Sequence, residues 1–361
     1  VPVVATGSIR HPDFVDQIIN DGKCDMVGMG RGILAEREWV KKCAEGREDE
    51  LRYCISCMNC FNVNPFSYEQ TNCSVNPFAL REGSKRPIVQ DGDGRLVAVI
   101  GAGPEAAVTL KQRGFDVVVF DKRDEIGGNL HVAKKPPFKG KFEWAIDYYK
   151  SMAKKLNITM KLGKEVTAQE VLALKPYSIL VATGSNVISI PLEGLDQVQT
   201  VQAHDVLAND MQFANKKVVV IGGGITGLET ALYINRQGTN QVSVVDMLPE
   251  WPVDMLDMRY QNEALLEVRH CNDQGVALFY NNKVVKFADG KLFIESTKDG
   301  EVKELPADVI VLSVGVKPND ALWQELLASG HPSVWKAGDA IATGKINKAV
   351  LHGSKFGYSL N

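Results

Sequence analysis

Residues 217–246 read "KVVVIGGGITGLETALYINRQGTNQVSVVD" and decide the fold class of this chain. An apolar strand runs into glycines at G-x-G-x-x-G spacing, and a helical stretch and a second apolar strand follow. Gly222 permits a tight turn, Gly224 lets the backbone approach a pyrophosphate, and Gly227 lets the helix pack closely on the strand. The N-terminus of that helix would face the phosphate charge. The stretch therefore predicts a Rossmann-type nucleotide-binding unit, against the alternative of a plain strand-to-helix turn.

The second strand of this unit ends in Asp246. A carboxylate about 20 residues after the glycines is placed to bind the ribose hydroxyls of a dinucleotide. The same carboxylate should repel the additional phosphate of NADP. Asp246 therefore favours NAD, and we expect NADH at this unit.

A second copy of the pattern occupies residues 96–121, "LVAVIGAGPEAAVTLKQRGFDVVVFD". Gly101 and Gly103 keep the first two glycine positions, but "PEA" follows and the third glycine is absent. Asp121 closes the second strand, about one helical turn sooner than in the other unit. We expect a nucleotide here as well, held by a short helix that packs differently or by an altered site. The alternative is a structural turn without a ligand.

Further strands extend both units along the chain. "YSILVATGS" at 177–185 and "DVIVLSVGVKPN" at 308–319 are apolar strands that run into glycine-containing turns. "SVWKAGDAIATGK" follows at 333–345. No low-complexity tract or short-period repeat is present, so the duplicated fold unit is the main organising feature.

Composition excludes several classes of partner. A chain of 361 residues with 45% hydrophobic content can bury the cores of two or three domains. A net charge of −3 gives no basic field for nucleic acid or anionic lipid. Apolar runs stop short of the roughly 20 residues that a membrane span needs, and no signal peptide opens the chain. We expect a soluble, cytoplasmic protein that binds neither nucleic acid nor membrane.

The N-terminal residues predict two strand–helix units. "VPVVATGS" at 1–8 and "CDMVGMGRG" at 24–32 are apolar strands that end in glycine, and "PDFVDQIIND" at 12–21 and "ILAEREWVKKCAEGR" at 33–47 are helical stretches. Such units are typical of the end of a parallel α/β barrel. Two units cannot close a barrel of eight, and the chain has no initiator Met. We expect a fragment of a longer protein.

Residues 51–90 hold a cluster of cysteines in a stretch rich in Pro and Asn, with "YCISCMNCF" at 53–61 and "NCSVNP" at 72–77. Four of the seven cysteines follow the spacing C-x2-C-x2-C-x12-C, namely Cys54, Cys57, Cys60 and Cys73. Three cysteines in a run with a late fourth favour a four-iron four-sulfur cluster. Zinc, which usually takes two separated C-x2-C pairs, and a redox dithiol are the alternatives.

The order of these motifs resembles the C-terminal part of the multidomain NADH:flavin oxidoreductases related to old yellow enzyme. That group includes 2,4-dienoyl-CoA reductase, trimethylamine dehydrogenase and clostridial enoate reductases. The resemblance is carried, over nearly the whole chain, by "ATGSIR", "GMGRG", the cysteine loop, "GAGP", "VATGS", "GGGITGLETA" and "AGDA". It implies an α/β fold: the end of a TIM barrel, an iron-sulfur loop, and a glutathione-reductase-like pair of Rossmann-type domains.

The resemblance also implies domain boundaries. Residues 1–50 would be the last two units of an incomplete barrel, and residues 51–93 the iron-sulfur loop. An FAD- or ADP-binding domain would comprise residues 94–214 and 319–361. An NAD(P)H-binding domain would occupy residues 215–318.

Binding residues follow from the family by position. The FMN phosphate would bind at the two barrel strand ends, at Gly7, Ser8, Gly30 and Arg31. The four cysteines would hold the cluster, with a spacing more like that of trimethylamine dehydrogenase than of dienoyl-CoA reductase. The ADP half of FAD would bind at Gly101, Gly103 and Asp121. The rest of FAD would lie near Gly128, Asn129, Thr183, Gly184 and Asp339. NADH would bind at Gly222, Gly224, Gly227 and Asp246.

The function implied by the resemblance is electron transfer along a chain of cofactors. NADH reduces FAD, FAD passes single electrons to the cluster, and the cluster reduces FMN, which reduces an activated alkene such as an enoyl-CoA or enoate. The complete protein would act on a small molecule, and a homo-oligomer is allowed. The family's substrate acids lie on earlier barrel strands, so this chain offers no catalytic proton donor.

Three alternatives stay open at this point. In the trimethylamine dehydrogenase branch an amine is oxidised, ADP replaces FAD and NADH is not used, and the shortened first glycine motif allows this. The chain could instead be a nucleotide-binding electron-transfer module without substrate chemistry of its own. A thiol-disulfide oxidoreductase would use Cys54 and Cys57 beside the flavin.

Overall fold

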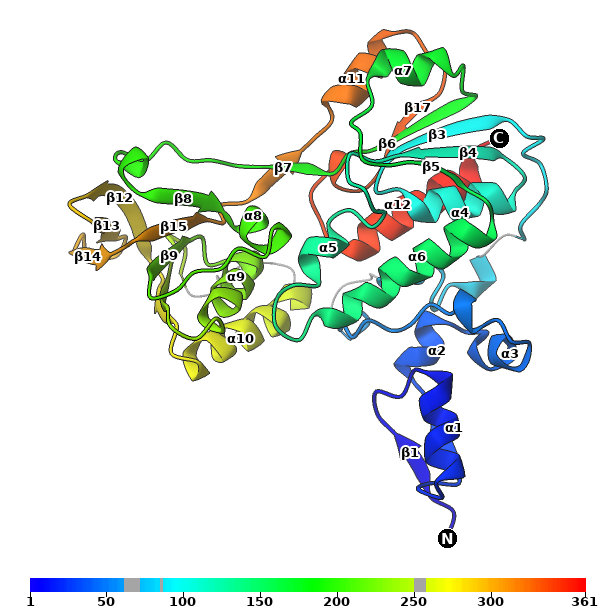
Figure 1. The fold of residues 1–361 in the computed structure, drawn as a ribbon, viewed down its shortest axis with the longest axis horizontal. Helices are drawn as coiled ribbons and strands as arrows, with labels where there is room; N and C mark the ends of the chain where they lie inside the picture. The colour runs from blue at the N-terminus through cyan, green and yellow to red at the C-terminus, as the bar shows by residue number, and fades with distance from the viewer. Residues whose placement is uncertain (62–71, 85–86, 250–257) are drawn as a thin grey trace.

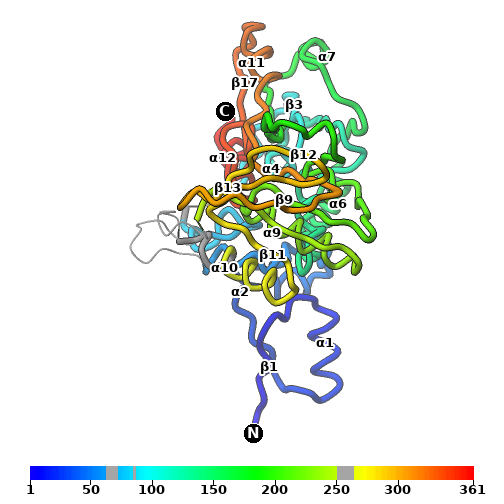
Figure 2. The backbone as a smooth tube through the Cα atoms, turned by 90° about the vertical axis from the view of Figure 1, so that its left-hand side faces the viewer, coloured from blue at the N-terminus to red at the C-terminus, as the bar shows by residue number. Residues whose placement is uncertain are grey.

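The computed structural model describes residues 1–61, 72–84, 87–249 and 258–361. Two α/β units lie side by side, and a smaller N-terminal segment projects away from them with the N-terminus at its tip (Figures 1 and 2). Both large sheets are parallel, which confirms the predicted α/β class.

The first unit is built on five parallel strands in the order β17-β6-β3-β4-β5. Its strands are β3 (Leu96–Gly101), β4 (Asp116–Phe120), β5 (Thr159–Lys161), β6 (Ser178–Ala182) and β17 (Val334–Lys336). β3 is central and pairs with β4 and β6. The near-continuous Val, Ile and Leu content of these strands is typical of a parallel sheet that is covered on both faces.

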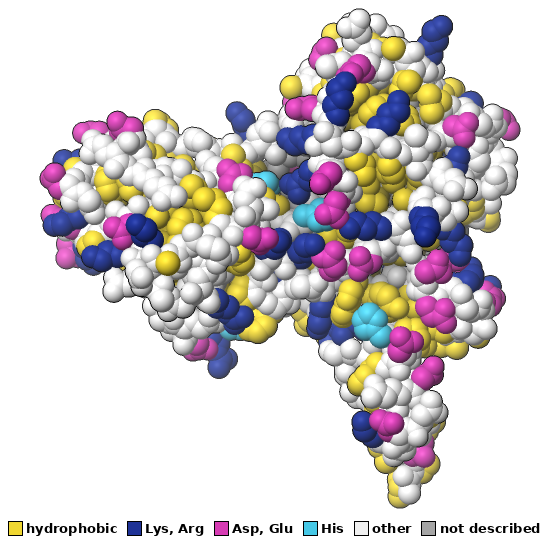
Figure 3. Space-filling model, in the orientation of Figure 1, with side chains coloured by type: hydrophobic (Ala, Val, Ile, Leu, Met, Phe, Trp, Pro, Cys, Tyr) yellow, Lys and Arg dark blue, Asp and Glu magenta, His cyan; other side chains and the backbone are white. Residues whose placement is uncertain are grey.

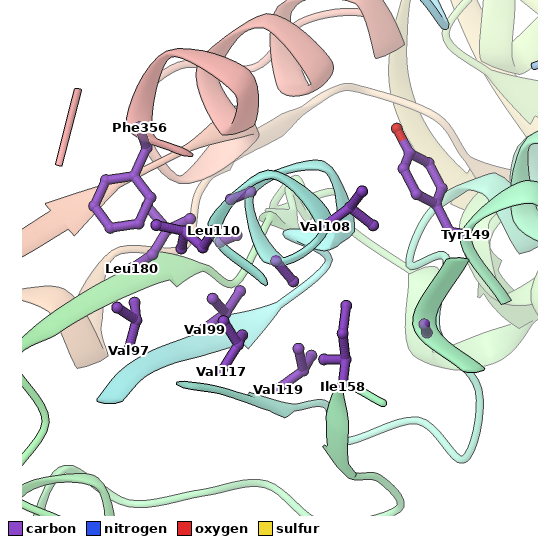
Figure 4. Packing of buried hydrophobic residues seen from close by; sticks show 14 of the residues in the cluster. Val97, Val99, Val108, Leu110, Val117, Val119, Tyr149, Ile158, Leu180 and Phe356 are labelled. Atoms are coloured by element: carbon purple, nitrogen blue, oxygen red, sulfur yellow. The ribbon is translucent and has the colours of Figure 1, made fainter. Parts of the chain in front are cut away.

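Successive residues of the first sheet point to opposite faces and build two separate cores. One face carries Val97, Val99, Val117, Val119 and Leu180. This face packs against α4 (Pro104–Gln112), α6 (Glu143–Lys155) and α12 (Ile346–Ser359). Figure 4 shows Val108 and Leu110 of α4 lying above these strands, with Phe356 of α12 beside Leu180. The alternate residues Ala98, Ile100, Ile179 and Val181 face α7 (Ala168–Ala173) and α11 (Ala321–Ala328).

The second unit repeats the architecture with the strand order β11-β10-β9-β15-β8. Its strands are β8 (Gln199–Gln202), β9 (Lys217–Ile221), β10 (Gln241–Val245), β11 (Ala277–Phe279) and β15 (Val309–Leu312). One face packs against α8 (Ala203–Ala208), α9 (Ile225–Asn235) and α10 (Met258–Asp273). The other face is covered by the antiparallel strands β12 (Asn282–Ala288), β13 (Lys291–Ser296) and β14 (Val302–Pro306).

The second unit begins earlier than the predicted boundary at residue 215. β8 and α8 both precede that residue, yet β8 pairs with β15 inside the second sheet. The sequence of β8, "QTVQ", is polar and has no glycine turn, so its pattern gave no sign of a sheet strand. The boundary therefore belongs before Gln199.

Two short strands connect the units. β7 (Ser185–Val187) carries the chain from the first unit to the second, and β16 (Val316–Pro318) brings it back. The two strands pair in antiparallel fashion, with Val187 opposite Val316. Figure 1 shows β7 spanning the space between the two sheets.

The N-terminal segment consists of β1 (Val4–Thr6), α1 (Pro12–Asn20) and β2 (Met26–Gly28), with β1 and β2 parallel. The single helix predicted at residues 33–47 is wrong, because the structure has α2 (Arg31–Ala35) and α3 (Trp39–Ala44). Glu36 interrupts them in an extended conformation, with φ −139° and ψ 95°. Its buried carboxylate accepts a hydrogen bond from the Glu38 N–H at 3.2 Å and an ion pair from Lys42 at 2.6 Å, which holds the break.

The remaining regular elements are short. Within the part of the chain that the structure describes, they comprise α5 (Leu130–Ala133) and five 3-10 turns, Glu48–Glu50, Glu82–Ser84, Gly140–Phe142, Leu195–Gln197 and Gly338–Ala340. In the described ranges, none of the helices combines the length and the apolar character that crossing a bilayer requires. Acidic and basic side chains alternate over the face seen in Figure 3, in keeping with the net charge of −3.

Candidate cofactor sites

The first glycine turn lies at the carboxyl end of β3 and leads directly into α4. Gly101 has φ +84°, and a Cβ atom there would stand 2.5 Å from the carbonyl oxygen of Ala182 on β6. Gly103 caps α4, and a Cβ atom there would stand 2.7 Å from Val99 Cγ1. Only glycine fits these two positions. The turn therefore brings backbone N–H groups and the helix N-terminus to the edge where a phosphate would bind.

The other residues predicted for the ADP half lie around this turn. Asp121 follows β4 and is 8% exposed, and its Oδ1 accepts a hydrogen bond from the Arg123 N–H at 3.0 Å. Burial raises the pKa of Asp121. Arg123 Nη1 donates to the carbonyl oxygen of Gly128 at 2.9 Å. Gly128 has φ +53°, and a Cβ atom there would overlap that of Ala102 in the turn, while Asn129 next to it caps α5.

Thr183, Gly184 and Asp339 lie at the carboxyl ends of β6 and β17, on the same edge of the sheet as the glycine turn. The Thr183 hydroxyl donates to the carbonyl oxygen of Asn319 at 2.6 Å, and the Asn319 N–H donates to Gly184 O at 3.0 Å. Asp339 Oδ1 accepts from the Gly344 N–H at 3.0 Å. Burial raises the pKa of Asp339. The structure thus brings the predicted FAD residues to one edge.

The second glycine turn joins β9 to α9. Gly222 has φ +108°, and a Cβ atom there would overlap the carbonyl oxygen of Ser313. Gly227 lies in the first turn of α9, and a Cβ atom there would overlap the carbonyl oxygen of Gly222. Gly224 caps α9 and has open space where a Cβ atom would point. The start of α9 is therefore tightly packed at Gly222 and Gly227 and has free space at Gly224.

Asp246 follows β10 beside this turn, as predicted from its place in the sequence. Its Oδ2 accepts a hydrogen bond from the Gly223 N–H at 2.6 Å, and its Oδ1 accepts from the Leu248 N–H at 2.8 Å. An ionised carboxylate has about four acceptor sites, so further donors can still bind. Asp246 therefore fixes the glycine turn and remains available for a ribose diol.

Three of the four predicted cluster cysteines lie beside a small apolar core. Cys54, Cys57 and Cys73 pack against the buried residues Ala35, Ile55, Val75, Phe142 and Ala145. Burial raises the pKa of Cys73 to about 11, and the charges of Cys57 and Cys54 add to the effect. The pKa of Cys60 is raised by burial and by the same two neighbours. Contact with one core places Cys54, Cys57 and Cys73 in one neighbourhood.

Cys57 also lies 3.1 Å from the hydroxyl of Ser74. Among the described residues, no group of three or more His, Cys, Asp or Glu side chains is placed to hold a metal ion. In a cubane each thiolate binds a different iron, so the sulfurs stand farther apart than the ligands of a single ion. The four cysteines supply soft sulfur donors of the kind that an iron-sulfur centre takes. Their chemistry therefore fits a four-thiolate centre.

The two barrel strand ends meet the cysteine loop. Gly7 and Ser8 follow β1, and Gly30 and Arg31 follow β2, so these residues share one edge of the parallel pair. Arg31 Nη1 lies 2.9 Å from Sδ of Met58, which stands between Cys57 and Cys60 in the sequence. The structure brings the predicted FMN-phosphate residues together and places the Arg31 guanidinium against the cysteine loop.

Arg10 was missed from the sequence, although it ends the quoted motif "ATGSIR". Its side chain is 5% exposed, and its guanidinium donates to Ser8 O and to Ser56 Oγ, each at 2.6 Å. Ser56 has φ +57°, a conformation that is uncommon for residues other than glycine. Arg10 therefore links the predicted FMN-phosphate turn to Ser56, which stands between Cys54 and Cys57 in the sequence.

Arg52 and Glu105 were also missed. Arg52 Nη1 lies 2.7 Å from Glu105 Oε2, and Nη2 lies 3.1 Å from Oε1, which is a bidentate ion pair. Arg52 also donates to Val75 O at 2.7 Å, and its guanidinium lies 4.4 Å from the Tyr148 ring centroid. The hydroxyl of Tyr149 donates to Glu105 Oε2 at 3.0 Å. The only sequence signal was Glu105, a charged residue next to the position at which the third glycine of the motif is absent.

Comparison with known proteins bears on these sites. Residues 95–350 match the family model of pyridine nucleotide-disulphide oxidoreductases. The chain belongs to this family. Residues 1–50 match the NADH:flavin oxidoreductase / NADH oxidase family. This order of segments confirms the predicted resemblance and identifies the chain as part of an oxidoreductase family that binds NAD(H) and flavin.

Three similar proteins each align over 90% or more of this chain. NADH oxidase from Thermoanaerobacter brockii is 34% identical, covering 100% of this chain and 56% of that protein. Cinnamate reductase from Clostridium sporogenes is 29% identical, covering 90% of this chain and 48% of that protein. A structure of 2-naphthoyl-CoA reductase with 2-naphthoyl-CoA has a TM-score of 0.90 and 27% identity, covering 100% of this chain and 54% of that one. The chain thus spans about half the length of the curated relatives it matches.

Proposed function

We propose that this chain conducts electrons from NADH at the second unit, through FAD at the first unit, to a 4Fe-4S cluster. The cluster ligands are Cys54, Cys57, Cys60 and Cys73. In the complete protein, the cluster would deliver electrons to FMN for the reduction of an activated alkene such as an enoyl-CoA or enoate. The names of two similar proteins, cinnamate reductase and 2-naphthoyl-CoA reductase, support this substrate class. We place the protein in the cytoplasm, where thiols stay reduced.

One observation carries the proposal. The cysteine loop lies between the barrel strand ends and the first nucleotide-binding unit, and charged side chains from both directions contact it. Arg10 and Arg31 reach it from the strand ends, and Glu105 reaches it through Arg52 from the start of α4. A cluster held there would be adjacent to both flavin sites.

When bound, the flavin and the cluster supply the conversion of a two-electron hydride into single-electron steps. The residues of this chain bind and orient these groups. Gly101 and Gly103 leave room for a pyrophosphate at the start of α4, and Asp121 accepts hydrogen bonds from a ribose. Gly224 and Asp246 do the same at the second unit. Cys54, Cys57 and Cys73 pack against one apolar core and stay half-buried.

An anaerobic preparation tests the proposal through its iron, acid-labile sulfide, flavin and visible spectrum. We expect about four irons per chain, as a cubane requires, together with bound FAD. Cys73→Ser should lose the iron. Cys43→Ser is the matched control, because Cys43 is half-buried on α3 and lies outside the four-cysteine set. Iron-free protein in which Cys54 and Cys57 form a disulfide would instead support a thiol-disulfide oxidoreductase.

A second candidate is ADP in place of FAD at the first unit, with oxidation of an amine. The shorter first unit favours it, because α4 has 9 residues whereas α9 has 11. Chromatography of the nucleotide released by acid distinguishes the two. FAD supports the proposal above, and ADP without flavin supports the second candidate.

A further inference from the structure

We propose that Arg52 and Glu105 are positioning residues that couple the cysteine loop to the first nucleotide site. In this role Arg52 connects the two ends of the cysteine loop and holds the loop against α4. It also neutralises the Glu105 carboxylate at the start of the helix that would bind the pyrophosphate. The inference rests on the proposed function, because it assigns a nucleotide to the first unit and a cluster to the cysteines.

The position of Arg52 allows its side chain to connect the two ends of the cysteine segment, and we call this set of contacts the clasp. Arg52 precedes Cys54 by two residues, and its guanidinium donates to the carbonyl oxygen of Val75, two residues after Cys73. The same group forms the bidentate pair with Glu105. One side chain therefore holds both ends of the cysteine segment against α4.

The burial of the pair argues for a role beyond stability. The side chains of Arg52 and Glu105 are 16% and 6% exposed, and Tyr148 and Tyr149 enclose them. A buried ion pair seldom stabilises a fold more than apolar residues of the same size would, because both charges must leave water. Its bidentate geometry does fix one relative placement of the two segments. That placement sets the distance between the cluster and the first nucleotide.

The place of Glu105 in α4 puts a negative charge close to the expected pyrophosphate. Glu105 is the second residue of α4, which begins at Pro104 directly after the glycine turn. A carboxylate in the first turn would repel the pyrophosphate that the helix N-terminus attracts. Arg52 supplies the compensating charge. In the second unit no acidic residue lies in the first turn of α9, so that unit needs no such partner.

Three variants of this chain test the coupling, with FAD and ADP as probes of the first unit and NADH as the probe of the second. Arg52→Met should weaken FAD and ADP binding at least tenfold, because Glu105 is left unpaired, and NADH affinity should stay within twofold. Arg52→Met/Glu105→Leu removes both charges and should restore FAD and ADP affinity to within threefold of the parent. Lys150→Ala, which removes an exposed ion pair with Glu125 on the same unit, is the control.

The cluster gives an independent readout. In the double variant the clasp is still missing, so the electron paramagnetic resonance spectrum and midpoint potential of the reduced cluster should stay altered although nucleotide affinity returns. The inference is overturned if Arg52→Met leaves FAD affinity unchanged, or if FAD and NADH affinities fall together, which indicates general destabilisation. It is also overturned if the double variant restores both the spectrum and the affinity. Absence of iron from the parent chain would contradict the proposed function, and the FAD and ADP measurements would still decide the electrostatic role of Arg52.

Discussion

The two nucleotide-binding units share a strand, a glycine turn and a helix, but the first turn of the helix has different surroundings in each. In the first unit, Glu105 is buried under Arg52 of the cysteine loop. In the second unit, Gly224 at the start of α9 faces open space. A ligand that must leave after each turnover needs an open helix start, whereas a retained cofactor tolerates a helix that is tied to its neighbour. On the proposed function, we therefore expect an exchangeable ligand at the second unit and a resident one at the first.

The largest expected effect comes from exchanging the third residue of the two glycine motifs. Gly227→Ala should destabilise the second unit by about 3 kcal/mol and abolish NADH binding, because the new Cβ atom would overlap Gly222 O. Ala106→Gly, the matched change in the first unit, adds no atom and should cost only about 1 kcal/mol of helix stability. Thermal unfolding and NADH titration measure both. Equal losses in the two variants would show that the helix starts are packed alike.

A smaller effect is expected from the carboxylates that end the second strands. Asp246→Asn leaves a single acceptor oxygen for the N–H groups of Gly223 and Leu248 and for a ribose. NADH affinity should fall about tenfold, or roughly 1.4 kcal/mol, and NADPH affinity should fall less. Asp121→Asn is the control in the other unit, and it should weaken FAD while leaving NADH affinity unchanged. An Asp246→Asn variant with parental NADH affinity would show that this carboxylate only fixes the turn.

The smallest expected effect is a pH dependence confined to the first unit. The Gly338 N–H donates to His352 Nδ1 at 3.2 Å, next to Asp339. Burial lowers the pKa of His352, and Lys355 and Lys348 add to this. The folded state therefore binds this proton less readily than the unfolded state, so the stabilisation is present above about pH 6.5 and is lost as the pH falls through the lowered pKa.

Release of bound FAD, followed by flavin fluorescence, should accordingly accelerate as the pH falls below about 6.5. His352→Gln has no titrating nitrogen and should flatten this dependence, while NADH affinity in the same pH range stays constant. If His352→Gln keeps the parental pH profile, another group controls flavin release.

The sequence predicted the features that depend on local backbone geometry. The glycine spacings located both turns, and the terminal aspartates follow the second strands as predicted. The grouping of the four cysteines around one cluster stays a prediction. The arginine contacts could not be predicted, because Arg52 and Glu105 are separated by 52 intervening residues and neither lies in a recognisable pattern. Burial and an ion pair, rather than helix propensity, decide the break at Glu36. β8 was missed because the strand is polar and its place in the sheet depends on a partner more than 100 residues later.

The paired strands β7 and β16 give the second unit a modular character. Val187 and Val316 face each other across this two-strand bridge, so the interval between them leaves and rejoins the first unit at a single place. Excising that interval and closing the bridge with a short turn would leave all five strands of the first sheet in place. A different domain could be grafted onto the same two strands. The chain therefore has the form of one α/β unit with a second α/β unit inserted into it between β7 and β16.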